Sequence, residues 1–147
     1  MQRLHTVLLL SLVAILLSLN SFAVETALTI TRVNEASALL MPFENADNAN
    51  GNSLSNRTAD IFLVLFLPSG AAGTATVTLT AQNTSTTVPG FGVMTKADLV
   101  IALALGEEKL VGPFPTRSWN NSSGNVILSY SGTGASDVDV AALRAIP

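Results

Sequence analysis

The chain lacks most of the side chains on which enzymes and metal proteins depend. It contains no cysteine, and its one histidine, His5, lies in an N-terminal stretch that has the features of an export signal. Without that stretch, the chain has no thiolate and no imidazole, which excludes cysteine and histidine nucleophiles, Ser-His-Asp triads, zinc sites and haem ligation. We therefore expect no enzyme, no cofactor and no metal site.

The N-terminus predicts a signal peptide over residues 1–23, followed by one domain over residues 24–147. Arg3 and His5 precede the apolar run Val7–Leu19, and Ser21-Phe22-Ala23 supplies the small residues of a cleavage site. The run is shorter than the roughly 20 residues that span a bilayer, so we expect no stable membrane anchor after cleavage. The protein is expected to be secreted or located at a cell surface, and a virion surface is the alternative location.

Charge is scarce and mostly negative. Charged residues make up 12% of the sequence, and the net charge is -3 at pH 7. Nucleic acid is a poor partner for such a chain, because binding it requires clustered lysine and arginine.

Short runs of apolar residues alternate with Thr and Ser and are separated by Gly, Asn and Pro, which is typical of strands. The predicted strands and strand-like runs are Thr26–Val33, Ala59–Leu67, Gly73–Gln82, Ala97–Leu105, Glu107–Val111, Asn125–Ser131 and Asp137–Ile146. A helix is the alternative for Ala97–Leu105. Glu44–Arg57 and Asn83–Gly92 are predicted to be loops. The expected fold is all-β, a single antiparallel β-sandwich or jelly roll of about seven or eight short strands.

The strength of the alternation differs between strands. It is clearest in Gly73–Gln82, where Ala75, Val77, Leu79 and Ala81 should face inward. Two other strands are apolar on both faces, so something is expected to cover both. A covering loop is one explanation, and burial against another copy of the chain is the other. The second predicts an interface made by Ile61, Leu63, Leu65, Leu67, Leu99, Ile101, Leu103 and Leu105.

Two acidic motifs deserve comparison with metal sites. Asp47–Asn52 resembles a calcium loop, but anchoring the pattern on Gly51 puts Arg57 where a bidentate Glu should be. Asp137 and Asp139 would share one face of a strand, yet no third ligand is near them. Turn formation and solvated carboxylates are the simpler interpretations.

Trp119, Asn120, Asn121 and Tyr130 suggest an alternative function. An aromatic platform flanked by asparagines is what a carbohydrate-binding module offers a sugar ring. The competing interpretation is that Trp119 anchors the turn over Pro113–Pro115.

Several short motifs in the second half of the chain carry a resemblance. They are Gly106–Pro115 (GEEKLVGPFP), Trp119-Asn120, Gly124–Tyr130 (GNVILSY) and Val138–Leu143 (VDVAAL). Over residues 106–143 the chain resembles small β-rich proteins encoded in the structural gene clusters of tailed phages. The resemblance implies a capsid-associated or decoration-like protein without catalysis.

Together these features predict a non-enzymatic exported structural subunit. It would self-assemble or decorate a larger surface assembly, such as a virion or a cell-surface filament or layer. Its partner would be a copy of itself or that larger assembly, and the strand Thr26–Val33 could add to a neighbour's sheet edge. The alternative is a secreted carbohydrate-binding module.

Overall fold

A computed structural model describes residues 24–33, 41–58, 60–90 and 92–145, and in them the chain is all-β, as expected. The first sheet contains β1 (Thr26–Ala27), β4 (Asn52–Ser55), β11 (Asn125–Ser131), β6 (Ala75–Leu79) and β9 (Leu99–Leu103), in this spatial order. The second contains β10 (Glu108–Val111), β5 (Ile61–Phe66), β12 (Asp139–Ala145) and β2 (Ile30–Val33), in this order, with β3 (Glu44–Asn45) also paired to β12. The predicted signal peptide lies outside the described residues.

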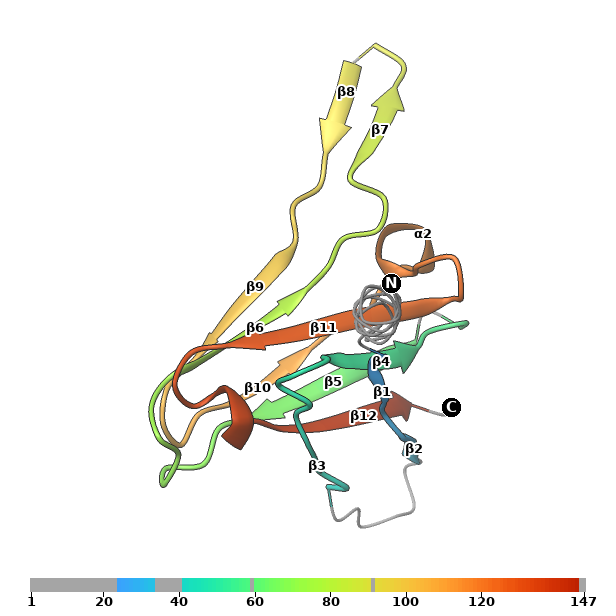
Figure 1. The fold of residues 1–147 in the computed structure, drawn as a ribbon. Coiled ribbons are helices and arrows are strands. Elements are labelled where there is room, and N and C mark those ends of the chain that lie inside the picture. Colours follow the sequence, from blue (N-terminus) through green and yellow to red (C-terminus); the bar gives the residue numbers. More distant parts are fainter. Residues whose placement is uncertain (1–23, 34–40, 59, 91, 146–147) are drawn as a thin grey trace, which may run out of the picture.

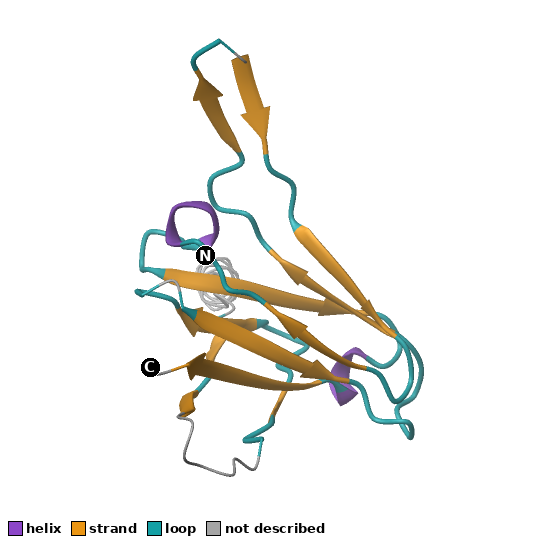
Figure 2. Ribbon diagram, turned by 180° about the vertical axis from the view of Figure 1, so that it is seen from behind, coloured by secondary structure: helices purple, strands orange, loops and turns teal. Residues whose placement is uncertain are grey.

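A separate two-stranded sheet, which we call the arm, consists of β7 (Ser85–Val88) and β8 (Gly92–Thr95). Figure 1 shows the arm projecting away from the two larger sheets. The only helices in the described part of the chain are one turn of α-helix, α2 (Thr116–Trp119), and a 3-10 turn, η1 (Ala135–Asp137), as Figure 2 shows.

The prediction of purely antiparallel sheets is wrong at the N-terminus. Thr26–Val33 is not one strand: it divides at Leu28 and Thr29 into β1 and β2, which belong to different sheets. The β1–β4 and β2–β12 pairs are both parallel, so both sheets are mixed. The division is held by a hydrogen bond from the Leu28 amide to Ser53 O (2.8 Å) and one from the Thr29 amide to the Glu44 carboxylate (2.9 Å).

The structure has twelve strands in its described residues, more than the seven or eight expected. The additional strands come largely from the two predicted loops: Glu44–Arg57 contains β3 and β4, and Asn83–Gly92 contains β7 and the start of β8. In β4 the polar side chain of Asn52 is fully buried and hydrogen-bonded to main-chain groups of Asp47 and Thr26. Satisfied in this way, a polar side chain is compatible with a buried strand.

One hydrophobic cluster contains side chains of both five-stranded sheets. The largest fully buried members are Leu54, Val77, Leu79, Leu103, Val126 and Leu128 from the first sheet, Ile61, Leu63 and Leu65 from the second, and Leu67 and Phe114 from connecting segments. The predicted inward positions of the Gly73–Gln82 strand are all buried. The prediction of a strand rather than a helix in Ala97–Leu105 is also confirmed, since β9 lies there.

Candidate functional site

The expected interface residues lie mostly inside the chain's own core. Ile61, Leu63, Leu65 and Leu67 are 0% exposed, and Ile101 and Leu103 are also buried. A side chain without exposed surface has none to bury against a neighbour, so the assignment of an interface to these six residues is corrected. Of the other two, Leu99 is half-buried against the core and Leu105 is 49% exposed.

The opposite half of the doubly apolar β5 strand faces outward instead. Phe62, Val64 and Phe66 alternate with the core residues and therefore point to the far side of the second sheet. Val64 pairs across the sheet with Leu110 of β10, and Phe62 pairs with Leu143 of β12. We call this side the outer face, and define it by its apolar residues Val33, Phe43, Phe62, Val64, Phe66, Leu110, Ala141 and Leu143. The register also places Thr31 beside Leu143, and Glu108 and Asp139 beside Phe66, on this side.

The outer face is apolar around the groove and only partly open, since Val64 and Ala141 at its centre are buried, at 2% and 1% exposure. Leu110 is 66% exposed, while Phe62 and Leu143 are half-buried. Val33, Phe62, Leu110 and Leu143 line a groove of about 220 Å³. At the other end of β5, the rings of Phe43 and Phe66 lie 5.9 Å apart between centroids and extend the apolar surface. None of the described residues that line the groove is charged.

The first sheet provides an internal comparison, because the outward residues of its central strands are mostly polar, with Ile127 of β11 as the exception. Thr76 and Thr78 of β6 and Ser129 of β11 alternate with core residues there. That is the ordinary pattern of a sheet with one wetted face. The second sheet departs from it.

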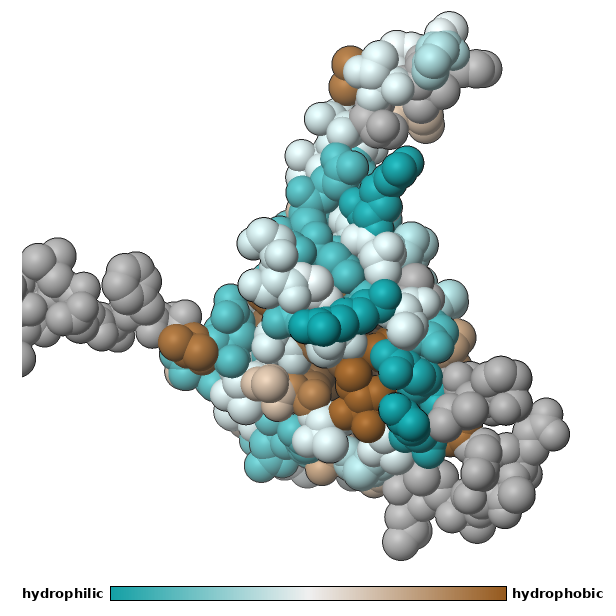
Figure 3. All heavy atoms as spheres, turned by 90° about the vertical axis from the view of Figure 1, so that its right-hand side faces the viewer, coloured by the Kyte–Doolittle hydropathy of each residue, from teal (hydrophilic) through white to brown (hydrophobic). Residues whose placement is uncertain are grey.

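The arm is another surface with exposed apolar side chains. Val93 is 66% exposed and Met94 is 57% exposed. Because the two residues are consecutive in β8, they point to opposite faces of the arm. In Figure 3 hydrophobic atoms gather near the end of the arm, and hydrophilic atoms lie between them and the body. The sequence from Ile61 to Thr95 contains no charged residue.

The base of the arm is fixed to the body near Trp119. The Lys96 amide donates to Thr84 O (2.8 Å), continuing the arm's ladder, and Lys96 Nζ lies 3.9 Å from the centroid of the Trp119 ring. Partial burial lowers the pKa of Lys96. A hollow of about 310 Å³ beside this contact is lined by Asn83, Met94, Thr95, Lys96, Arg117 and Ser118.

The residues of the alternative sugar site do not form a platform. Trp119 is only 7% exposed, with Lys96 over its ring and the Phe114 ring packed edge-on 6.2 Å away. Such a ring has no open face for a sugar, and its contact with Phe114 fits the anchoring interpretation. Tyr130 is also largely buried, and burial raises the pKa of its hydroxyl.

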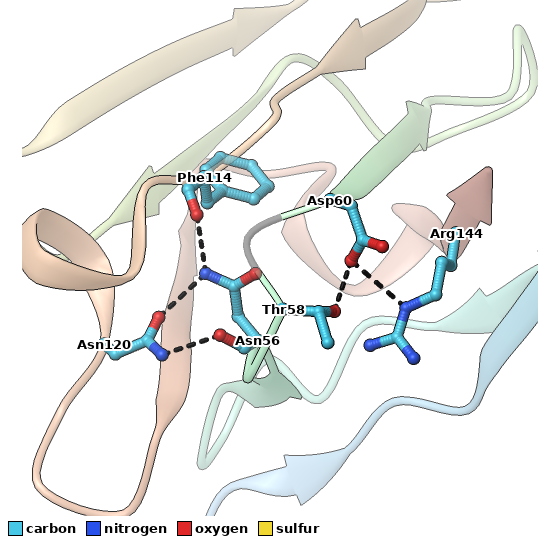
Figure 4. Close-up of polar contacts among 6 residues, drawn as sticks. All are labelled: Asn56, Thr58, Asp60, Phe114, Asn120 and Arg144. Atoms are coloured by element: carbon cyan, nitrogen blue, oxygen red, sulfur yellow. Dashed lines mark hydrogen bonds and ion pairs between the residues drawn. The ribbon is translucent and has the colours of Figure 1, made fainter. Parts of the chain in front are cut away.

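The two asparagines are occupied with structural hydrogen bonds. Asn120 Nδ2 donates to Asn56 O (2.7 Å), and Asn120 Oδ1 accepts from Asn56 Nδ2 (2.8 Å), as Figure 4 shows. Asn121 Oδ1 accepts from the amides of Ser123 and Asn125 at 2.9 and 3.0 Å. The carbohydrate-binding assignment of these residues is therefore not supported by their placement.

The acidic motifs have structural partners. Hydrogen bonds from the Thr26 hydroxyl and from Asn50 lower the pKa of Asp47 from 3.8 to about 2 and close its turn. Asp137 lies in η1 and accepts from the Ala72 amide, whereas Asp139 lies in β12, where partial burial raises its pKa. In the ranges that the structure describes, no three His, Cys, Asp or Glu side chains gather as a metal site would require.

None of the described helices is long and apolar enough to cross a bilayer. Comparison of the chain with protein-family models, with curated proteins and with solved structures finds no match.

The residues that sequence reasoning missed are those of the outer face. The unbroken apolar run of β5 indicated that both faces of this strand are apolar. The alternation alone did not say which half faces the core.

Proposed function

We propose that the chain is a non-enzymatic structural subunit that joins an assembly through the outer face, with its two five-stranded sheets stacked as a β-sandwich. The assembly consists of copies of the chain or is a larger surface structure, such as a virion or a cell-surface filament or layer. In this proposal residues 1–23 act as the export signal, and the protein works outside the cytoplasm. The capsid-associated or decoration-like role that the resemblance of residues 106–143 implies is part of this proposal.

The apolar outer face is the observation that carries this proposal. A sheet face that meets water normally alternates polar with apolar residues, as β6 does, and a contiguous exposed apolar patch usually marks an interaction site. Leu110 exposes 66% of its surface next to a groove whose lining, among the described residues, consists of Val33, Phe62, Leu143 and Leu110 itself. Burying this surface against a partner would remove apolar area from water at about 25 cal/mol per Å².

Self-association of the purified protein tests the proposal. We expect a concentration-dependent rise in mass by light scattering, and we expect Leu110→Asp to abolish it by placing a charge in the groove. Val100→Asp is the matched control, because Val100 is 63% exposed on the first sheet. A monomer at every concentration would overturn assembly with copies of itself.

A further inference from the structure

We infer that the groove on the outer face receives the arm of a second copy, so that copies of the chain associate head to tail. This inference rests on the proposed function, since it names the occupant of the same surface.

The arm has no partner of its own among the described residues. β7 and β8 pair only with each other, in the register Ser85↔Thr95 to Val88↔Gly92. An isolated two-stranded hairpin is marginally stable in water, and this one exposes an apolar side chain on each face. A contact that covers Val93 or Met94 would stabilise it.

The arm points away from its own groove. Figure 1 shows it extending beyond β6 and β9, at the opposite end of the molecule from β2, whose residue Val33 lines the groove. The arm of one copy can therefore reach such a groove only on a neighbour.

The two surfaces match in chemistry. The groove is lined by four apolar side chains, and the arm offers Val93 and Met94 from a segment without charge. Because the chain has a net negative charge, two copies repel each other electrostatically. This repulsion is smallest where both contacting surfaces are uncharged. The arm and the β5 part of the groove both lie within Ile61–Thr95, an uncharged stretch of the sequence.

A contact between two different surfaces is heterologous. Such contacts propagate into filaments, or close into rings if the rotation between neighbours permits. The arm-in-groove contact would thus produce an extended or cyclic assembly rather than a symmetric dimer.

Cysteine pairing tests the contact directly, because the native chain has no cysteine. Single variants Val93→Cys and Leu110→Cys are purified, mixed and oxidised. We expect the fraction of disulfide dimers that join Val93→Cys to Leu110→Cys to exceed the fraction that random pairing would give. Val100→Cys, at a site of similar exposure, replaces Leu110→Cys as the control and should show no excess.

An arm-deletion variant separates this inference from the proposed function. Ser85–Thr95 is replaced by Asn-Gly, a two-residue hairpin turn that joins Thr84 to Lys96, whose main chains are already hydrogen-bonded at 2.8 Å. We expect a folded protein that has lost self-association.

Three outcomes distinguish the possibilities. Loss of association on arm deletion, with the mixed disulfide, supports the inference. Association that survives arm deletion but is lost in Leu110→Asp overturns the inference and leaves the proposed function standing, and homodimers of Leu110→Cys would then indicate face-to-face pairing. A wild-type protein that stays monomeric overturns this inference and, within the proposed function, assembly with copies of itself.

Discussion

Replacing Asn56 with Asp should destabilise the protein strongly at neutral pH. Asn56 follows β4 and is 0% exposed, and its Nδ2 donates to Phe114 O (2.7 Å) and to Asn120 Oδ1 (2.8 Å). These bonds tie the end of β4 to the segment that leads into α2 (Figure 4). An aspartate has the same shape but, when ionised, has no proton to donate.

The size of the effect follows from the two acceptors left without a donor. Each buried unsatisfied group costs about 1–3 kcal/mol, so the free energy of unfolding should fall by about 2–6 kcal/mol at pH 7. Rotating the Asn120 amide would not help, because its Nδ2 also donates to Asn56 O at 2.7 Å. The loss is a large part of the roughly 5–15 kcal/mol that stabilises a typical domain.

The loss should also depend on pH. Burial among acceptors raises the pKa of the new carboxyl in the folded state above its unfolded value of about 3.9. Protonation restores a donor, so the destabilisation should be smallest below about pH 4 and should grow as the pH rises through the folded pKa.

Urea unfolding of wild type and variant at pH 4 and pH 7, followed by circular dichroism, measures both effects. Asn121→Asp is the control, because Asn121 Oδ1 only accepts hydrogen bonds, from the Ser123 and Asn125 amides, and a carboxylate can accept both. If the free energies of unfolding of Asn56→Asp and Asn121→Asp differ by less than about 0.5 kcal/mol at pH 7, the hydrogen bonds of Asn56 do not stabilise the fold.

Three further predictions concern other parts of the fold. The pKa of Asp47 is lowered from 3.8 to about 2, chiefly by the Thr26 hydroxyl, so the contribution of Asp47 to stability should be lost as the pH falls from about 4 towards 2. The free energy of unfolding should therefore fall more steeply in this window for wild type than for Asp47→Asn, and parallel curves would refute this. Leu65→Ala should cost about 2–5 kcal/mol in denaturant unfolding, because Leu65 is 0% exposed in the core, and a cost under about 1 kcal/mol would argue against its packing. Lys96→Ala should uncover Trp119, whose ring lies 3.9 Å from Lys96 Nζ, and so increase acrylamide quenching of the single tryptophan; unchanged quenching would contradict that contact.

The parts of the fold that sequence predicts well are those in which local pattern and burial agree. β6 alternates apolar residues with threonine, and its apolar positions are the buried ones. In β5 the pattern correctly indicates that both faces are apolar. It gives no basis for choosing Leu63 rather than Phe62 as the core residue, because that choice depends on which sheet packs on which side.

Long-range contacts explain what the sequence does not predict. β4 looks like a loop because its buried residues include Asn52 and Ser53, and Asn52 is satisfied by groups that only the folded chain brings near, such as Thr26 O at 3.2 Å. Trp119 looks like a binding platform until Lys96, distant in sequence, is placed over its ring. The division of Thr26–Val33 between two sheets likewise depends on pairing with β4 and β12.

The most direct test of the central claim is the mass of the purified protein across a concentration series, by light scattering, for wild type, Leu110→Asp and Val100→Asp. Assembly through the outer face predicts that wild type and Val100→Asp grow in mass with concentration while Leu110→Asp stays monomeric. Equal masses for all three proteins at every concentration would contradict it.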